Sequence, residues 1–240
     1  MKRLIPINLV LPVILIALGI LIVVYTANNP TDSLVARMLS YTNMFKALRE
    51  HFMLMVVSMT GAIIVGVLSG IMLSRPKLYY LGRVVENIVN IGQTVPPLAV
   101  LALLFVIMGI GFRMAVFALF LYSILPILRN TFAGIINVQP SIIESAKGMG
   151  MSPFRILTRI ELPLAFPIIV AGIRTAVVIN VGTAAMATFI GGGGLGDLIV
   201  AGISLGREMV IFTGAALAAL TAILLDHVIG QVEKGLVRWS

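Results

Sequence analysis

Cysteine is absent from this chain of 240 residues, and charged residues make up only 11% of it. The lack of cysteine excludes disulfide bonds, thiolate zinc sites and cysteine nucleophiles. An ordinary soluble domain carries about 25% charged residues, whereas here 60% of the residues are hydrophobic. Because so few polar residues cannot coat a water-exposed surface, a water-soluble monomer is excluded and an integral membrane protein is predicted.

Six apolar runs have about the length that crosses the hydrocarbon core of a membrane as a helix. They cover Leu4–Tyr25, Phe52–Ser74, Asn87–Gly111, Met114–Ile136, Phe166–Ile190 and Met209–Leu225. The expected fold is therefore an all-α membrane protein with six transmembrane helices. A cleaved signal peptide is the alternative for the first run, but no small-x-small cleavage site precedes Asn28, and a retained anchor is favoured.

Lysine and arginine are spread unevenly over the connections between these runs. The larger share lies on the side that also holds Lys2, Arg3 and the connection over residues 137–165. The positive-inside rule places that side in the cytoplasm, so both termini are expected to be cytoplasmic. The net charge of +8 is then explained by topology, and a nucleic-acid partner loses its support.

Residues 1–50 are interpreted as an N-terminal transmembrane anchor followed by an external segment, and residues 51–240 as the main membrane domain. In the external segment, Thr31, Asp32 or Ser33 could cap a short helix over the apolar residues that follow. Such a helix is expected to lie on the outer membrane surface, and a plain linker is the alternative.

The connection over residues 137–165 carries helix signals. Ser141 and Glu144 have the Ser-x-x-Glu spacing of a capping box, which predicts a helix start. Gly150 is expected to end this helix because glycine accepts the left-handed C-cap conformation, and Ser152 is expected to cap a second helix. Together the two helices would expose apolar side chains that lipid cannot cover, which predicts a protein partner.

Seven residues of this connection have a fixed spacing, with three residues before the glycine and nine after it. They are Glu144, Ser145, Ala146, Gly150, Ile160, Leu162 and Pro163. The pattern resembles the EAA loop of binding-protein-dependent ABC importer permeases, Glu-Ala-Ala, x3, Gly, x9, Ile-x-Leu-Pro, with serine for one alanine. The resemblance covers the chain from about His51 onward and implies a type I importer core of five helices, to which the first run adds a sixth.

What this resemblance implies is a coupling helix that seats in a groove of a separate ATPase subunit. ATP and Mg²⁺ would be bound by that subunit, so no cofactor is expected in this chain, and the chain is expected not to be an enzyme. Further implied partners are a second permease chain, identical or related, and an extracytoplasmic substrate-binding protein. The implied location is the cytoplasmic (inner) membrane of a bacterium or archaeon, in contact with lipid.

Polar residues within the apolar runs are candidate pathway residues. They are Gln93 and Thr94, beside Pro96 and Pro97, in the third run and Asn180 and Thr183 in the fifth. The two prolines remove backbone donors and predict a kink or break, and broken backbone is tolerated at membrane depth where it lines a cavity. Ordinary hydrogen bonding between helices is the equally weighted alternative for the polar side chains.

Four consecutive glycines follow the fifth run, and Gly193 and Gly194 are candidate members of a flexible outer gate. A tight structural turn is the alternative. The spacing G-x-G-x-x-G is met by count, but a dinucleotide site needs a strand before it and a helix after it in a βαβ unit. No P-loop motif occurs in the chain, so nucleotide binding is not expected here.

Arg174 lies inside the fifth run, where a cation needs an acidic partner, carbonyl groups or water. Glu86 and Asp226 lie on the cytoplasmic side of their own runs and are the candidate partners; a structural ion pair is favoured over a gating or substrate role. Gly66 and Gly70 have the G-x-x-x-G spacing of close helix packing. The two histidines lack a ligand cluster, so no metal site is expected, and no catalytic residue is assigned.

Three stretches resemble the osmoprotectant branch of these importers, which carries glycine betaine, carnitine and choline: Gln93–Ala99, Leu121–Asn130 and Ile190–Asp197. Quaternary cations are usually held by an aromatic cage. With Trp239 as the single tryptophan, this chain is poorly equipped for one, and the cage is expected on the binding protein. The alternatives are another small polar solute, such as an amino acid or a sulfonate, and a stand-alone secondary transporter, which would call for internal repeats and intramembrane acids.

Overall fold

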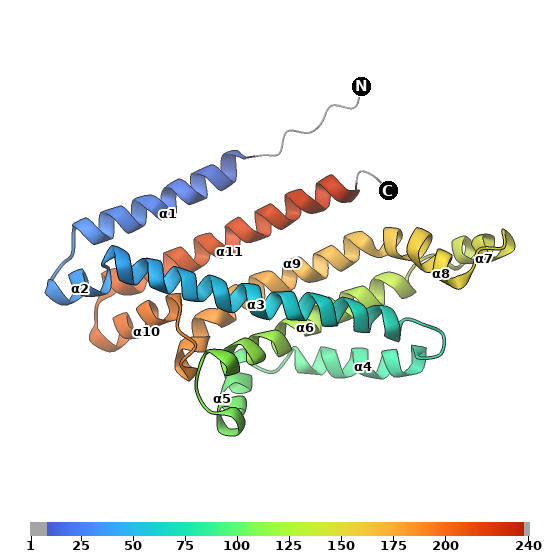
Figure 1. Cartoon of the computed structure of the whole chain (residues 1–240), viewed down its shortest axis with the longest axis horizontal. Helices are drawn as coiled ribbons and strands as arrows, with labels where there is room; N and C mark the ends of the chain where they lie inside the picture. Colours follow the sequence, from blue (N-terminus) through green and yellow to red (C-terminus); the bar gives the residue numbers. More distant parts are fainter. Residues whose placement is uncertain (1–8, 238–240) are drawn as a thin grey trace.

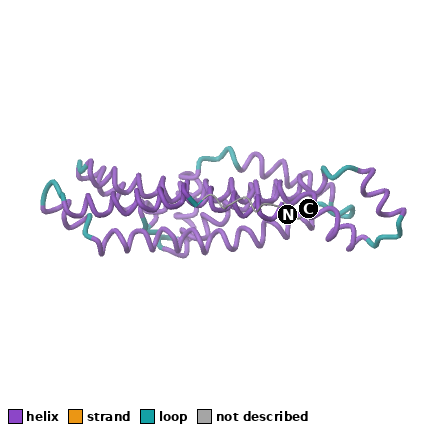
Figure 2. The backbone as a smooth tube through the Cα atoms, turned by 90° about the horizontal axis from the view of Figure 1, so that it is seen from above, coloured by secondary structure: helices purple, strands orange, loops and turns teal. Residues whose placement is uncertain are grey.

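A computed structural model describes residues 9–237, and every regular element in that part of the chain is a helix. The long helices are α1 (Val10–Asn28), α3 (Tyr41–Leu73), α6 (Phe112–Ile136), α9 (Leu162–Met186) and α11 (Glu208–Val237). They run roughly along one axis (Figure 1), and the view from above shows a long, narrow bundle (Figure 2). Four residues used above, Lys2, Arg3, Leu4 and Trp239, lie outside the described residues.

Five helical segments are long and apolar enough to cross a membrane, and a sixth span results if α4 (Tyr79–Gly92) and α5 (Pro97–Met108) count as one. These two helices are bent against each other by 100°. The break expected at Pro96 and Pro97 is therefore confirmed. The first part of that run lies in α4, which begins before the run does, at Tyr79. Arg83 and Glu86, which precede the run, form an ion pair at 3.2 Å on the surface of this helix and do not interrupt it.

The segment between the first two spans is helical and packed on the protein. Asp32 caps α2 (Ser33–Met38), since its carboxylate accepts the N–H groups of Leu34 and Val35, each at 2.9 Å. Val35 and Leu39 are fully buried in a cluster with residues of α10 (Leu195–Leu205) and α11. The short helix is confirmed, and its residue Val35 packs on the protein together with Leu39. Its placement on the outer membrane surface stays a prediction.

Two of the expected spans are shorter than the helices that contain them: the second begins too late and the sixth ends too early. The helix α3 starts at Tyr41, where Ser40 caps it, and it runs without interruption through residues 50 and 51. The helix α11 extends to Val237, and α10 has no counterpart among the expected runs. The expected spans stopped at charged residues, whereas a helix can continue past the point where its composition ceases to be apolar. The helices are therefore longer than the apolar runs within them.

The core is formed by α3, α6 and α9. Gly66 and Gly70 lie against α6, where an added Cβ would come within 2.8 Å of Ile127 and 2.6 Å of Thr131. Their expected role in close helix packing is thereby confirmed. The described start of α1 and the described end of α11 both point toward the end of the bundle that carries α7 (Pro140–Gly148) (Figure 1). The cytoplasmic placement of both termini stays a prediction.

Candidate functional site

The candidate coupling loop begins with α7 at one end of the bundle (Figure 1). Gln139 is the N-cap, Pro140 occupies the first turn, and no side chain caps this helix. The expected capping box of Ser141 and Glu144 is therefore wrong. Proline has a backbone angle suited to the first helical position, so the helix starts earlier and Ser141 is already inside it, where its carbonyl accepts the Ser145 hydroxyl at 2.8 Å.

The turn after α7 follows the expectation. Gly150 has a φ of +79°, its N–H donates to the Lys147 carbonyl at 2.9 Å, and the N–H of Met151 donates to the Ala146 carbonyl at 3.1 Å. This pair of bonds is a Schellman motif. Ser152 then caps α8 (Pro153–Ile156), accepting the Arg155 N–H at 3.4 Å. The helix end at Gly150 and the new start at Ser152 are both confirmed.

The second half of the loop is part of a long helical shaft. The helix α8 continues through the π-helical turn η1 (Leu157–Glu161) into α9, so Ile160, Leu162 and Pro163 lie in the shaft rather than at the tip. A π-turn beside Pro163 is a usual way to accommodate a helix position without a backbone donor. Glu161 also forms an ion pair with Arg75 at 2.7 Å, which ties the shaft to the end of α3.

The tip of the loop exposes apolar surface. Met149 and Phe154 are each 73% exposed, and Ile142 is 37% exposed. Glu144 is also exposed, and it makes no hydrogen bond or ion pair among the described residues, whereas Ala146 is fully buried. A surface of this kind at the end of a membrane bundle is suited to a protein partner, with Glu144 free to contact it.

The break between α4 and α5 is stabilised from α6. Thr94 donates to the Ile91 carbonyl at 2.7 Å, and Tyr122 of α6 donates to the Val95 carbonyl at 3.1 Å. The side-chain nitrogen of Gln93 is buried without a partner in the described chain. Tyr122 was not among the candidate residues, because nothing in the sequence indicates which loop carbonyl a distant hydroxyl reaches.

Asn180 lies in a buried network between three helices. Its side-chain N–H groups donate to Ser123 of α6 at 2.7 Å and to Ser58 of α3 at 3.0 Å. All three side chains are at most 1% exposed. Thr183 donates to the carbonyl of Ile179 in its own helix at 2.8 Å. This geometry matches the interhelical hydrogen-bonding alternative for Asn180, and the pathway role of either residue stays a prediction.

We expect Asn180→Ala to lower stability, because it removes two interhelical bonds and leaves two buried hydroxyls without this partner. Such bonds contribute on average about 0.6 kcal/mol each in a membrane protein, so the melting temperature should fall by about 2–4 °C. Thr183→Val is the control, since its hydroxyl bonds only within its own helix, and it should melt like the wild type. An Asn180→Ala protein of unchanged stability that lost transport would favour the pathway role instead.

The glycine run forms a tight turn held by α3. It follows the 3₁₀ turn η2 (Ala187–Ile190), and Gly193 and Gly194 have φ angles of +76° and +96°. The N–H of Gly194 donates to Glu50 of α3 at 3.2 Å, and a Cβ on Gly193 would come within 2.7 Å of the same carboxylate. These contacts favour the structural-turn alternative over a freely flexible gate.

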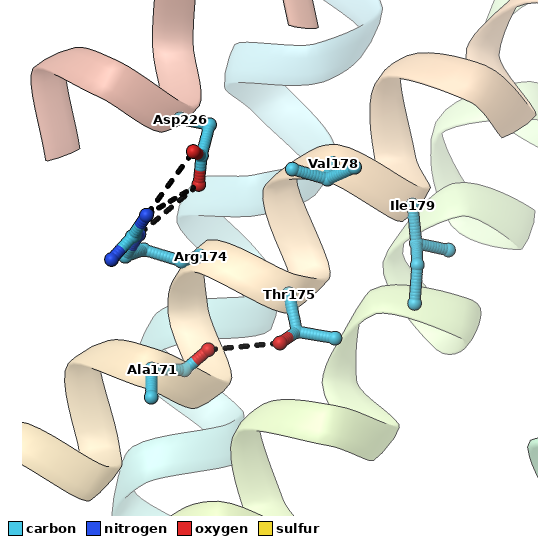
Figure 3. A pocket seen from close by; sticks show the side chains of 6 residues that line it. All are labelled: Ala171, Arg174, Thr175, Val178, Ile179 and Asp226. Atoms are coloured by element: carbon cyan, nitrogen blue, oxygen red, sulfur yellow. Dashed lines mark hydrogen bonds and ion pairs between the residues drawn. The ribbon is translucent and has the colours of Figure 1, made fainter. Parts of the chain in front are cut away.

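Arg174 pairs with acids of α11. Its guanidinium lies 3.0 Å from Asp226 and 3.1 Å from Glu233. The expected partnership with Asp226 is confirmed and is visible in Figure 3. The alternative prediction, that Arg174 pairs with Glu86, is wrong, because Glu86 pairs with Arg83 of its own helix. Among the described residues, no group of three histidine, aspartate or glutamate side chains is placed to hold a metal ion.

Comparisons with known proteins agree with this architecture. Residues 62–238 match the family described as binding-protein-dependent transport system inner membrane component. Similar proteins include the osmoprotectant import permease protein OsmY of Salmonella typhimurium, 47% identical over 188 residues, 78% of this chain and 80% of that protein. The glycine betaine/carnitine/choline transport system permease protein OpuCD of Bacillus subtilis is 44% identical over 78% of this chain and 81% of its own length.

The choline transport system permease protein OpuBB of Bacillus subtilis is 43% identical over 78% of this chain and 85% of that protein. Among solved structures, an inward-facing conformation of the MetNI methionine ABC transporter shares the fold. Its matching chain has a TM-score of 0.71 and 24% identity, and the match covers 80% of this chain and 95% of that chain.

Proposed function

This chain belongs to the binding-protein-dependent transport system inner membrane components, the permease subunits of ABC importers, and on that premise we propose that it carries quaternary-ammonium osmolytes. The observation that supports the solute is its 47% identity, over most of both chains, with a permease named for osmoprotectant import. Relatives named for glycine betaine, carnitine and choline, at 43–44% identity, point to the same solute class. As a permease, the chain is a transport subunit rather than an enzyme.

In this proposal α7 docks on a separate ATPase subunit, which holds ATP and Mg²⁺. The exposed side chains of Met149 and Phe154 supply apolar contact area, and Glu144 is available for a polar contact. The helical shaft over residues 153–190 is continuous, so a displacement of the docked tip is carried directly into α9. The pair between Arg75 and Glu161 passes the same displacement to α3.

The further partners follow from this arrangement. One chain supplies one coupling helix, so a second permease chain, identical or related, serves the other ATPase. An extracytoplasmic binding protein delivers the solute and carries the aromatic cage, since aromatic residues are only 7% of this chain. The complex sits in the cytoplasmic membrane of a bacterium or archaeon, with both termini of this chain in the cytoplasm.

The solute is tested through the binding protein. We expect isothermal titration of the partner binding protein to show tight binding of glycine betaine, carnitine or choline, because the aromatic cage resides there. We also expect proteoliposomes that contain the whole complex to take up the same solute only with ATP inside. A binding protein that ignored all three solutes but held an amino acid or a sulfonate tightly would replace the osmolyte with that solute and leave the importer intact.

A further inference from the structure

One side of α9 is left uncovered by the rest of this chain along most of the helix. Its exposed residues recur every three or four positions, so they lie on one stripe. Members of the stripe are Ile168, Ala171, Thr175, Val178, Gly182 and Met186. The stripe also carries two residues with little apolar surface: Thr175, whose hydroxyl donates to the Ala171 carbonyl at 3.0 Å, and Gly182.

A cluster of three charged side chains flanks the stripe. Arg174 of α9 reaches α11, where it pairs with both Asp226 and Glu233. The two acids are two turns apart and therefore lie on the same side of α11. Gly230 lies between them, and a Cβ there would come within 3.2 Å of the guanidinium carbon of Arg174. With one cation and two anions, the cluster carries one excess negative charge.

This cluster cannot face lipid tails. About a third of the side-chain surface of Arg174 and of Asp226 is exposed, 35% and 39% respectively. Arg174 lies within the helical segment Pro153–Ile190, which is long and apolar enough to cross a membrane. Uncovered charges within such a segment face a water-filled space or another protein. The stripe of α9 therefore borders a water-filled space or another protein, and the accessibility measurement below distinguishes the two.

We propose that the open cavity between α9 and α11 is a transit site for the cationic head of a quaternary-ammonium solute; the solute rests on the proposed function. The cavity has a volume of about 410 Å³, and Ala171, Arg174, Thr175, Val178, Ile179 and Asp226 line it (Figure 3). Small-molecule sites have volumes of about 300–1,000 Å³. The excess negative charge attracts the trimethylammonium group, and the methyl groups of Thr175 and Val178 offer it apolar contact.

The same cluster can also bind zwitterionic solutes. A carboxylate on the solute, as in glycine betaine or carnitine, can accept hydrogen bonds from Arg174. To do so it competes with Asp226 and Glu233, which already occupy the guanidinium. This competition keeps binding weak, and a solute in transit must enter the site readily and also leave it readily.

The chain contains no cysteine, so Thr175→Cys introduces a single thiol into the cavity of the assembled complex. The rates of its modification by two methanethiosulfonates, one bearing trimethylammonium and one bearing sulfonate, report access and local charge. After each rate is divided by the same reagent's rate with a free thiol in solution, we expect the cationic reagent to react about fivefold faster than the anionic one, as a partly exposed carboxylate would give. Asp226→Asn should lower this ratio and Arg174→Gln should raise it, and millimolar choline should slow the cationic reagent.

Glu86→Gln is the matched control, because it neutralises an acid that pairs with Arg83 outside the cavity, and it should leave the ratio unchanged. A thiol that reacts with neither reagent would mean a closed protein contact and would overturn the site. The site would also be overturned if Asp226→Asn and Arg174→Gln gave the same ratio of the two modification rates. The same holds if choline did not slow modification of the thiol by the cationic reagent. These readouts need no transport, so they fail or succeed separately from the solute-binding measurement that tests the proposed function.

Discussion

Gly150→Val is expected to abolish most of the coupling between ATP hydrolysis and transport while leaving membrane insertion intact. Gly150 has a φ of +79°, which a β-branched residue reaches only with strain. The left-handed conformation costs about 1–2 kcal/mol in a residue with a Cβ, so the equilibrium constant for forming the native turn should fall about tenfold. We expect solute-stimulated ATPase activity and uptake in proteoliposomes to fall by about that factor.

Two variants separate backbone strain from loss of contact. No atom lies within 4 Å of a Cβ built on Gly150, so the cost comes from the backbone and not from a clash within this chain. Gly150→Asn should therefore retain most activity, because asparagine tolerates the left-handed region. Gly148→Ala, in the last turn of α7 and equally uncrowded, should be neutral. Full activity in Gly150→Val would mean that this turn does not couple the subunits.

Gly196→Ala is expected to have the largest effect on folding of any glycine-to-alanine substitution in the described chain. Its Cβ would lie 1.9 Å from the backbone carbonyl oxygen of Ala185, and backbone atoms of α9 cannot move aside as a side chain can. The start of α10 would have to leave α9. Overpacking typically costs about 1–3 kcal/mol, which corresponds to a melting temperature lower by about 2–12 °C.

The yield of monodisperse protein after detergent extraction and its melting temperature measure this effect. Gly182→Ala is the matched control on α9, since a Cβ there meets no atom within 4 Å in this chain, and it should melt like the wild type. If Gly196→Ala were as stable as Gly182→Ala, the close approach of α10 to α9 would be wrong.

Local chemistry explains why part of this protein is predictable from its residues alone. Three features act through their own backbone or through adjacent residues: the apolar runs, the prolines at the α4–α5 break and the glycine at the coupling turn. These features predict the membrane class, the order of the spans, the break between α4 and α5 and the left-handed conformation of Gly150. The capping box did not form, because Pro140 starts the helix first, a competition between two local signals that spacing alone cannot rank.

Pairings between distant residues required the packed structure. Arg174 and Asp226 are 52 residues apart, Asn180 and Ser58 are 122 apart, and Glu50 and Gly194 are 144 apart. Each pair depends on the rotation and axial register of two helices, which many weak side-chain contacts set together. Glu233 shows the consequence: its charge was visible in the sequence, but only the packing of α11 on α9 brings it to Arg174. Thus the membrane class and the coupling loop can be predicted from local chemistry, whereas the charged cavity depends on helix packing.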